Sequence, residues 1–96
     1  MDIGAITRLR YAIEATIRMQ PTVSSADALG TAAQDFRERA LSLLDPALKD
    51  EFEEIFPPLR ESGPDLLESA AGARSAHARL LGMHGWLEGL EKTQSR

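Results

Sequence analysis

The stretch DLLESAAGARSAHARLLGMHGWLEGLEK, residues 65–92, decides the fold of this chain of 96 residues. Its apolar side chains recur at steps of three, four and seven, which is the spacing of one buried face of an α-helix. We therefore expect one long helix over residues 65–92 that packs on a core through this stripe. The stripe comprises Leu66, Ala73, Ala76, Leu80, Met83, Leu87 and Leu90.

A second line, on nearly the opposite side of the same helix, contains only small residues. A glycine inside a helix costs about 0.5–1 kcal/mol relative to alanine, so three glycines on one line require a physical reason. Without side chains in the way, another helix backbone can approach closely. The line therefore predicts an interface between copies of the chain, or else a close approach to another helix of the same chain. It comprises Ala71, Ser75, Ala78, Gly82, Gly85 and Gly89.

Trp86 lies between these two lines of the helix. An indole ring is large and amphipathic, which suits either the interface between copies or a peripheral position in the core. We include Trp86 among the expected interface residues.

Two helices are expected in the first half of the chain. The first covers residues 3–19 and ends before Pro21, because proline lacks an amide hydrogen and disfavours helix at the preceding residue. Ser24 or Ser25 is expected to cap the second helix, which reaches about residue 44. The charged segment at residues 37–39 is expected to face solvent. The buried positions expected in these helices are Ile6, Leu9, Ile13 and Ile17, then Leu29, Ala33, Phe36, Ala40 and Leu43.

A short third helix is expected to begin at Asp45-Pro46. Aspartate is a good N-cap, and proline at the first helical position loses only an amide that has no partner there. Leu48, Phe52 and Ile55 are expected on its inner side, and prolines at residues 57–58 end it. The complete prediction is an all-α fold: one domain over residues 1–96, a four-helix bundle with a short third helix and a long C-terminal helix.

The third helix also carries an acidic run, which predicts a solvent-exposed face. Arginines of the first helix offer a complementary charge across a boundary between copies, although exposed ion pairs are worth only about 0–1 kcal/mol. The two sets are Asp50, Glu51, Glu53 and Glu54 on the third helix and Arg8, Arg10 and Arg18 on the first.

The composition excludes several classes of function. A formal net charge of −4 disfavours a nucleic-acid binder, which needs a clustered positive surface. The chain contains no cysteine, which fits a reducing cytoplasm. No apolar run approaches the roughly 18 residues of a membrane span, and the start MDIGAITRLR lacks the order of a signal peptide. We expect a cytoplasmic protein without a membrane or nucleic-acid partner.

Catalytic and metal chemistry are not expected. His77 and His84 lie seven residues apart on one helix, a rise of about 10.5 Å, which is too far to share a metal ion. Glu88 has the right spacing from His84, but two ligands make a weak site. No serine stands in the context of an activated nucleophile. The sequence therefore predicts a protein that is not an enzyme and holds no metal or cofactor.

Three segments resemble the bacterial proteasome activator family of actinobacteria (Bpa/PafE-like). LDPALKDEF at residues 44–52 is similar to the family's Leu-x-Pro-x-Leu-basic-acidic-Glu-Leu helix start, and IFPP at residues 55–58 is similar to the apolar–proline turn that ends that helix. GWLEGL at residues 85–90 looks like the family's Gly-Trp-Leu-Glu-Gly-Leu. An Ala/His/Arg-rich stretch at residues 74–81 precedes it, where the family has an Ala/Gln-rich one.

The resemblance implies a four-helix protomer that assembles into a ring. Such a ring caps the proteasome core particle without ATP and admits unfolded proteins, so the implied partners are further copies, the core particle and unfolded clients. The family docks through a terminal Gly-Gln-Tyr-Leu, whereas this chain ends in TQSR at residues 93–96. No residue matches the docking motif, so the chain is either a shortened or divergent member or a fold kept for another use. The alternative function is a small regulatory or adaptor module that binds one protein partner without proteasome contact.

Overall fold

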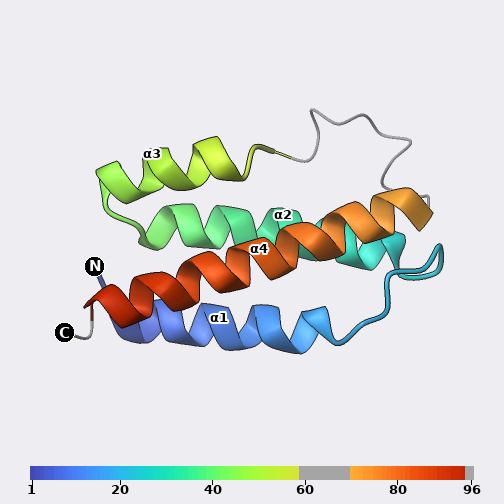
Figure 1. Cartoon of the computed structure of the whole chain (residues 1–96), viewed down its shortest axis with the longest axis horizontal. Helices are drawn as coiled ribbons and strands as arrows, with labels where there is room; N and C mark the ends of the chain where they lie inside the picture. The colour runs from blue at the N-terminus through green and yellow to red at the C-terminus, as the bar shows by residue number, and fades with distance from the viewer. Residues whose placement is uncertain (59–69, 95–96) are drawn as a thin grey trace.

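The computed structural model describes residues 1–58 and 70–94, and within them every regular element is helical (Figure 1). The elements are α1 (Ile3–Ile17), α2 (Ala26–Leu43), α3 (Pro46–Ile55) and α4 (Ala70–Gln94). With 10 residues α3 is short, and with 25 residues α4 is long. The predicted all-α fold with four helices is confirmed. The expected start of the last helix at residues 65–69 lies outside the described residues.

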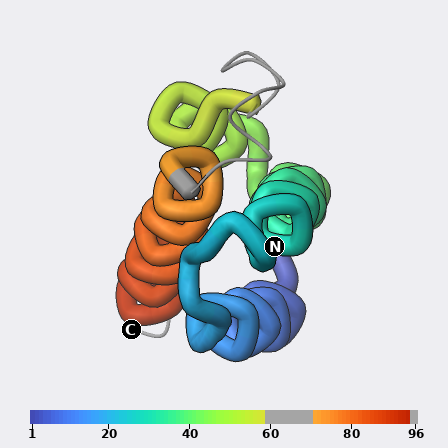
Figure 2. The backbone as a smooth tube through the Cα atoms, turned by 90° about the vertical axis from the view of Figure 1, so that its right-hand side faces the viewer, coloured from blue at the N-terminus to red at the C-terminus, as the bar shows by residue number. Residues whose placement is uncertain are grey.

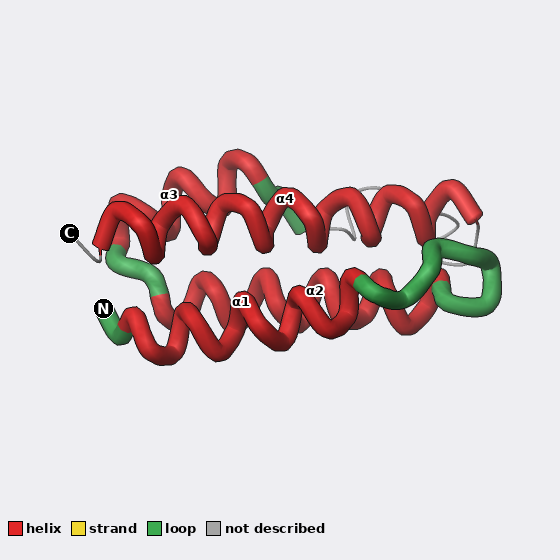
Figure 3. Tube along the Cα trace, turned by 60° about the horizontal axis from the view of Figure 1, so that its bottom comes forward, coloured by secondary structure: helices red, strands yellow, loops and turns green. Residues whose placement is uncertain are grey.

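Successive helices run in opposite directions, so the bundle is up-and-down (Figures 1 and 3). Seen from the end, α1, α2 and α4 form a triangle, and α3 lies over the edge that α2 and α4 share, away from α1 (Figure 2). Because α3 covers only this edge, no other helix of the described residues lies on the outer side of α4.

The core lies between the four helices and is built from aliphatic and aromatic side chains. Phe52 is the largest fully buried side chain, and its ring contact to Trp86, at 5.2 Å between centroids, joins α3 to α4. It also contacts the ring of Phe56 at the end of α3, at 4.9 Å between centroids. Of the expected core residues, Ile17, Leu43 and Leu48 are partly buried and pack against the core. The others are buried: Ile6, Leu9, Ile13, Leu29, Phe36, Phe52, Leu80, Met83, Leu87 and Leu90.

The helix starts follow local capping chemistry. The Asp2 carboxylate accepts a hydrogen bond from the backbone amide of Ala5 at 3.2 Å and caps α1. Ser25 is the N-cap residue of α2, but its hydroxyl binds the preceding turn, accepting from the Thr22 amide at 2.9 Å. Asp45 is the N-cap residue of α3, with Pro46 at the first helical position, as expected.

Arg37 does not face solvent, which corrects the expectation of an exposed charged segment. Its side chain is only 8% exposed, and its Nε donates a hydrogen bond to the carbonyl oxygen of Phe56 at 2.7 Å. The physical reason is helical spacing: residue 37 follows Ala33 by four positions and precedes Ala40 by three, and both alanines are fully buried. Glu38 and Arg39, in contrast, are exposed.

Ile55 also departs from expectation, because it is 51% exposed, whereas its neighbour Phe56 is buried. Phe56 follows Phe52 by four residues, so the two rings share one side of the helix and pack together. The expected inner side of α3 is therefore correct at Leu48 and Phe52 and wrong at Ile55.

Candidate functional site

The outer side of α4 carries the small residues that the sequence aligns on one helix face, and all six are exposed in the single chain. They are Ala71, Ser75, Ala78, Gly82, Gly85 and Gly89, and we refer to them as the small-residue line. Leu81 lies at the margin of the line and is 50% exposed. We take the line as the candidate functional site because packing within the protomer does not explain why these exposed positions carry small residues.

The three glycines of the line have different surroundings. A Cβ atom added at Gly85 or Gly89 would meet no atom of the described residues within 4 Å. A Cβ atom at Gly82 would lie 3.0 Å from Cε1 of Phe56, which is closer than ordinary packing. Glycine therefore admits the Phe56 ring at residue 82, but no close approach among the described residues explains Gly85 or Gly89.

Trp86 lies between the small-residue line and the core. It is partly buried, and its ring meets Phe52 of α3 edge to face, at 5.2 Å between centroids and an interplanar angle of 70°. Such edge-to-face pairs are worth about 0.5–1.5 kcal/mol beyond the buried area. The indole thus supports the packing of α3 on α4 while part of it stays accessible.

A hollow of about 360 Å³ opens beside Trp86, between the start of α3 and the end of α4. Glu51 of α3 and Gly89 of the small-residue line both contribute to its wall. The outer surfaces of α3 and α4 are therefore continuous at this point. The remaining lining residues are Leu48, Leu90, Thr93 and Gln94.

The side of α4 that faces α1 is held to that helix by three polar contacts, which we call the polar ladder. The Arg10 guanidinium donates a hydrogen bond from Nε to the Glu91 carboxylate. His84 Nε2 lies 3.5 Å from the Glu14 carboxylate, and His77 Nε2 lies 2.8 Å from the carbonyl oxygen of Ile17. These contacts hold α4 with its glycines turned outward.

The first contact of the ladder is largely shielded from water. The side chains of Arg10 and Glu91 are 15% and 14% exposed. Burial acts to lower the pKa of Arg10, but the hydrogen bond and the charge of Glu91 outweigh it, so the pKa is raised above its ordinary value. The Arg10 guanidinium is thereby held against α4 by the Glu91 carboxylate.

The two histidines take part in this helix packing and do not approach each other. His77 and His84 are seven residues apart and contact different partners on α1. Within residues 1–58 and 70–94, no group of three or more His, Cys, Asp or Glu side chains is placed to hold a metal ion.

The end of α3 is fixed by two arginines from different helices. Arg37 of α2 donates to the carbonyl of Phe56, and Arg79 of α4 donates from Nη1 to the carbonyl of Pro57. Burial, followed by the positive charge of Arg37, lowers the pKa of Arg79 from its ordinary value. Sequence reasoning missed this pair, although the position of Arg37 between Ala33 and Ala40 was a signal for it.

No model of a protein family matches this chain, and neither the curated proteins nor the solved structures contain a match to it. Across the helical segments that the structure describes, none has the length and apolar character needed to cross a membrane.

Proposed function

We propose that this chain is a non-enzymatic helical-bundle protein that self-associates through the outer side of α4 and acts by binding other proteins. The observation that carries the proposal is the open space at Gly85 and Gly89, where an added Cβ would meet no atom within 4 Å. Each glycine lowers the stability of an isolated helix by about 0.5–1 kcal/mol relative to alanine. No packing within residues 1–58 and 70–94 offsets this cost at the two positions.

A second helix backbone offers a physical reason for the two glycines. Helices usually pack with their axes about 8–10 Å apart, and small residues at the contact allow the lower part of this range. On α4 the exposed alanines and glycines extend over residues 71–89 and provide such a contact along several helical turns. Leu81 at the margin adds an apolar side chain that association would remove from water.

The resemblance of the sequence to the bacterial proteasome activator supplies the biological part of the proposal. We infer that the assembly works in the cytoplasm as a ring that promotes the entrance of unfolded proteins into a proteasome core without ATP. The support is the segment GWLEGL at residues 85–90. Its two glycines face outward, whereas Leu87 and Leu90 are buried. In this segment the leucines therefore serve the core of the protomer, and the glycines serve the proposed contact with another copy.

The first test is the mass of the native protein by light scattering, compared with the Gly85→Leu variant. The wild-type chain is expected to exceed the 10.5 kDa of one copy severalfold. The leucine has open space in the protomer, so helix content should be retained, while the assembly should shift toward smaller species. A wild-type protein of one-copy mass at all concentrations would refute self-association.

The second test concerns the proteasome. The assembled protein is incubated with core particles from an actinobacterium, and both co-sedimentation and peptide degradation are measured. Binding with faster degradation supports the activator function. Self-association without binding or stimulation would instead favour a regulatory or adaptor module with a single protein partner.

A further inference from the structure

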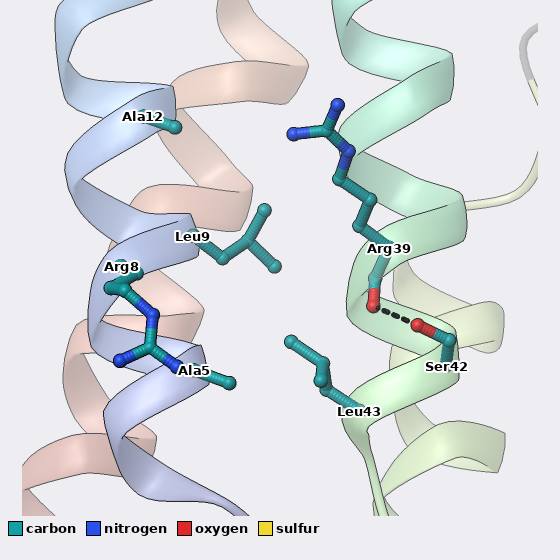
Figure 4. Close-up of a pocket in the computed structure, with 7 residues that line it drawn as sticks. All are labelled: Ala5, Arg8, Leu9, Ala12, Arg39, Ser42 and Leu43. Atoms are coloured by element: carbon teal, nitrogen blue, oxygen red, sulfur yellow. Dashed lines mark hydrogen bonds between the residues drawn. The ribbon is translucent and has the colours of Figure 1, made fainter.

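A groove runs between α1 and α2, with α4 behind it in the view of Figure 4. Its volume is about 310 Å³. Leu9 and Leu43 face each other across the groove, and Arg8 and Arg39 stand on its two walls (Figure 4). The α1–α2 groove is lined by Ala5, Arg8, Leu9, Ala12, Arg39, Ser42 and Leu43.

The charge of the α1–α2 groove is positive, because two arginines and no carboxylate line it. Arg39 makes no ion pair with any described residue, and its guanidinium lies 5.7 Å from the ring centre of Phe36. Arg8 has only a long contact, 3.9 Å, to Asp2, and its side chain is 75% exposed. The groove therefore suits an apolar side chain that is flanked by carboxylates.

The outer side of α3 presents an exposed apolar side chain flanked by carboxylates. The helix contains four carboxylates and one lysine among 10 residues, and all four carboxylates are exposed. None of them forms an ion pair within the described part of the chain. Ile55 is 51% exposed, with Glu51 one helical turn before it and Glu54 beside it.

We propose that the α1–α2 groove of one copy receives α3 of a second copy. Ile55 lies over Leu9 and Leu43, and Glu51 and Glu54 approach the two arginines of the walls. The inference rests on the proposed self-association and identifies the surface of the neighbouring copy that receives α3. Complementary charge fixes the register and orientation of such a contact more than its strength.

Because the two surfaces differ, the contact is head-to-tail. Such a contact closes into a ring when the rotation between copies allows it and otherwise gives an open filament. Glu51 and Gly89 line the same hollow, so α3 and the small-residue line belong to one continuous side of the protomer. One neighbouring copy therefore covers both.

The test is a charge exchange between two variants of the full chain, with mass measured by light scattering. The first variant carries Arg8→Glu and Arg39→Glu, and the second carries Glu51→Arg and Glu54→Arg. Each variant alone places like charges across the contact, so its mass is expected to fall toward the 10.5 kDa of one copy. In an equimolar mixture every contact between one variant and the other pairs opposite charges, so the two are expected to alternate and the mass to return toward the wild-type value. Arg18 belongs to the arginines of the first helix that the sequence pattern offers as partners of the acidic run, but it is exposed and does not line the groove. Arg18→Glu is therefore the control and should keep the wild-type mass.

The outcomes separate this inference from the proposed function. A wild-type protein of one-copy mass overturns both. Wild-type assembly that persists in both charge variants, or that the mixture does not restore, overturns only the α3–groove contact. Circular dichroism checks that each variant is folded. If the groove variant unfolds, the α3 variant decides, because its two substitutions lie on exposed positions of α3.

Discussion

Arg37 of α2 donates a hydrogen bond from Nε to the carbonyl oxygen of Phe56, at 2.7 Å. It thereby joins α2 and the end of α3, two helices with few other contacts between them. Phe56 is the C-cap residue of α3, where backbone carbonyls lack partners within the helix. A buried guanidinium that binds such a carbonyl satisfies two polar groups at once. This hydrogen bond, together with the Phe52–Trp86 contact and the Arg79 hydrogen bond to Pro57, fixes the position of α3 and with it the proposed contact surface.

Arg37→Met is therefore expected to destabilise the protein. Methionine keeps much of the side-chain volume but leaves the Phe56 carbonyl without its donor, which costs about 1–3 kcal/mol. Urea unfolding followed by circular dichroism measures the loss. Arg18→Met, at an exposed position, is the matched control and should change stability by less than about 0.5 kcal/mol. Equal effects of the two substitutions would contradict the role given to Arg37.

Substitution by alanine is expected to change the stability of the protomer differently at Gly85 and at Gly82. Gly85→Ala should raise the stability of the protomer by about 0.5–1 kcal/mol, because the new methyl group meets no atom within 4 Å. Gly82→Ala should gain less or lose stability, because its methyl group would lie 3.0 Å from the Phe56 ring. Unfolding midpoints are compared at the lowest workable concentration, so that association does not contribute. A larger gain at residue 82 than at residue 85 would be inconsistent with the described packing.

Two carboxylates of α4 should differ in their effect on stability. Glu91→Gln removes the charge that Arg10 faces across the helix contact, where both side chains are largely shielded, and should cost about 1–3 kcal/mol. Glu88→Gln removes an exposed pair with Lys92 at 3.3 Å and should cost less than about 0.5 kcal/mol. Thermal unfolding of both variants in the same buffer provides the comparison, and a milder effect of Glu91→Gln would speak against the polar ladder.

Two residues three positions apart on α3 give a matched pair for the core. Phe52 is fully buried, and Phe52→Ala should cost about 3–5 kcal/mol, enough to unfold much of a small domain. Ile55 is 51% exposed, so Ile55→Ala should leave the unfolding of the isolated protomer nearly unchanged. Circular dichroism and tryptophan fluorescence report both, since the Trp86 ring contacts Phe52. A strong effect of Ile55→Ala on the isolated protomer would place this side chain in the core.

The sequence pattern predicts most of the fold because its local signals agree with one another. Proline at residues 21 and 46 marks helix boundaries through the missing amide hydrogen, and the structure has boundaries near both. The stripe through Leu80, Met83 and Leu87 needs only helical periodicity to be recognised, and all three are fully buried.

Features that depend on long-range placement could not be predicted in this way. Arg37 is charged, and its partner is the carbonyl of a residue 19 positions away, so composition alone assigns it to the surface. Ile55 and Phe56 are adjacent apolar residues, and the packing of α3 on α2 and α4 decides which of them is buried.

The candidate site, too, could be predicted from the sequence only in part. Periodicity places the small residues on one face of a helix, but it does not reveal that Gly82 contacts Phe56, whereas Gly85 and Gly89 have open space. The α1–α2 groove was not predicted, because its shape depends on how two helices pack side by side.

The polar ladder gives α4 a single register against α1. Its members on α4, at residues 77, 84 and 91, are spaced by two helical turns. A slip of one turn toward the start of α4 would bring Ala73, Leu80 and Leu87 into their places. Arg10 and Glu14 would then be covered by hydrocarbon and would keep only their pairing with each other within α1, at 3.5 Å. A misaligned pairing of α1 and α4 would therefore lose all three polar contacts together. The folding chain should as a result have one favoured antiparallel alignment of these two helices.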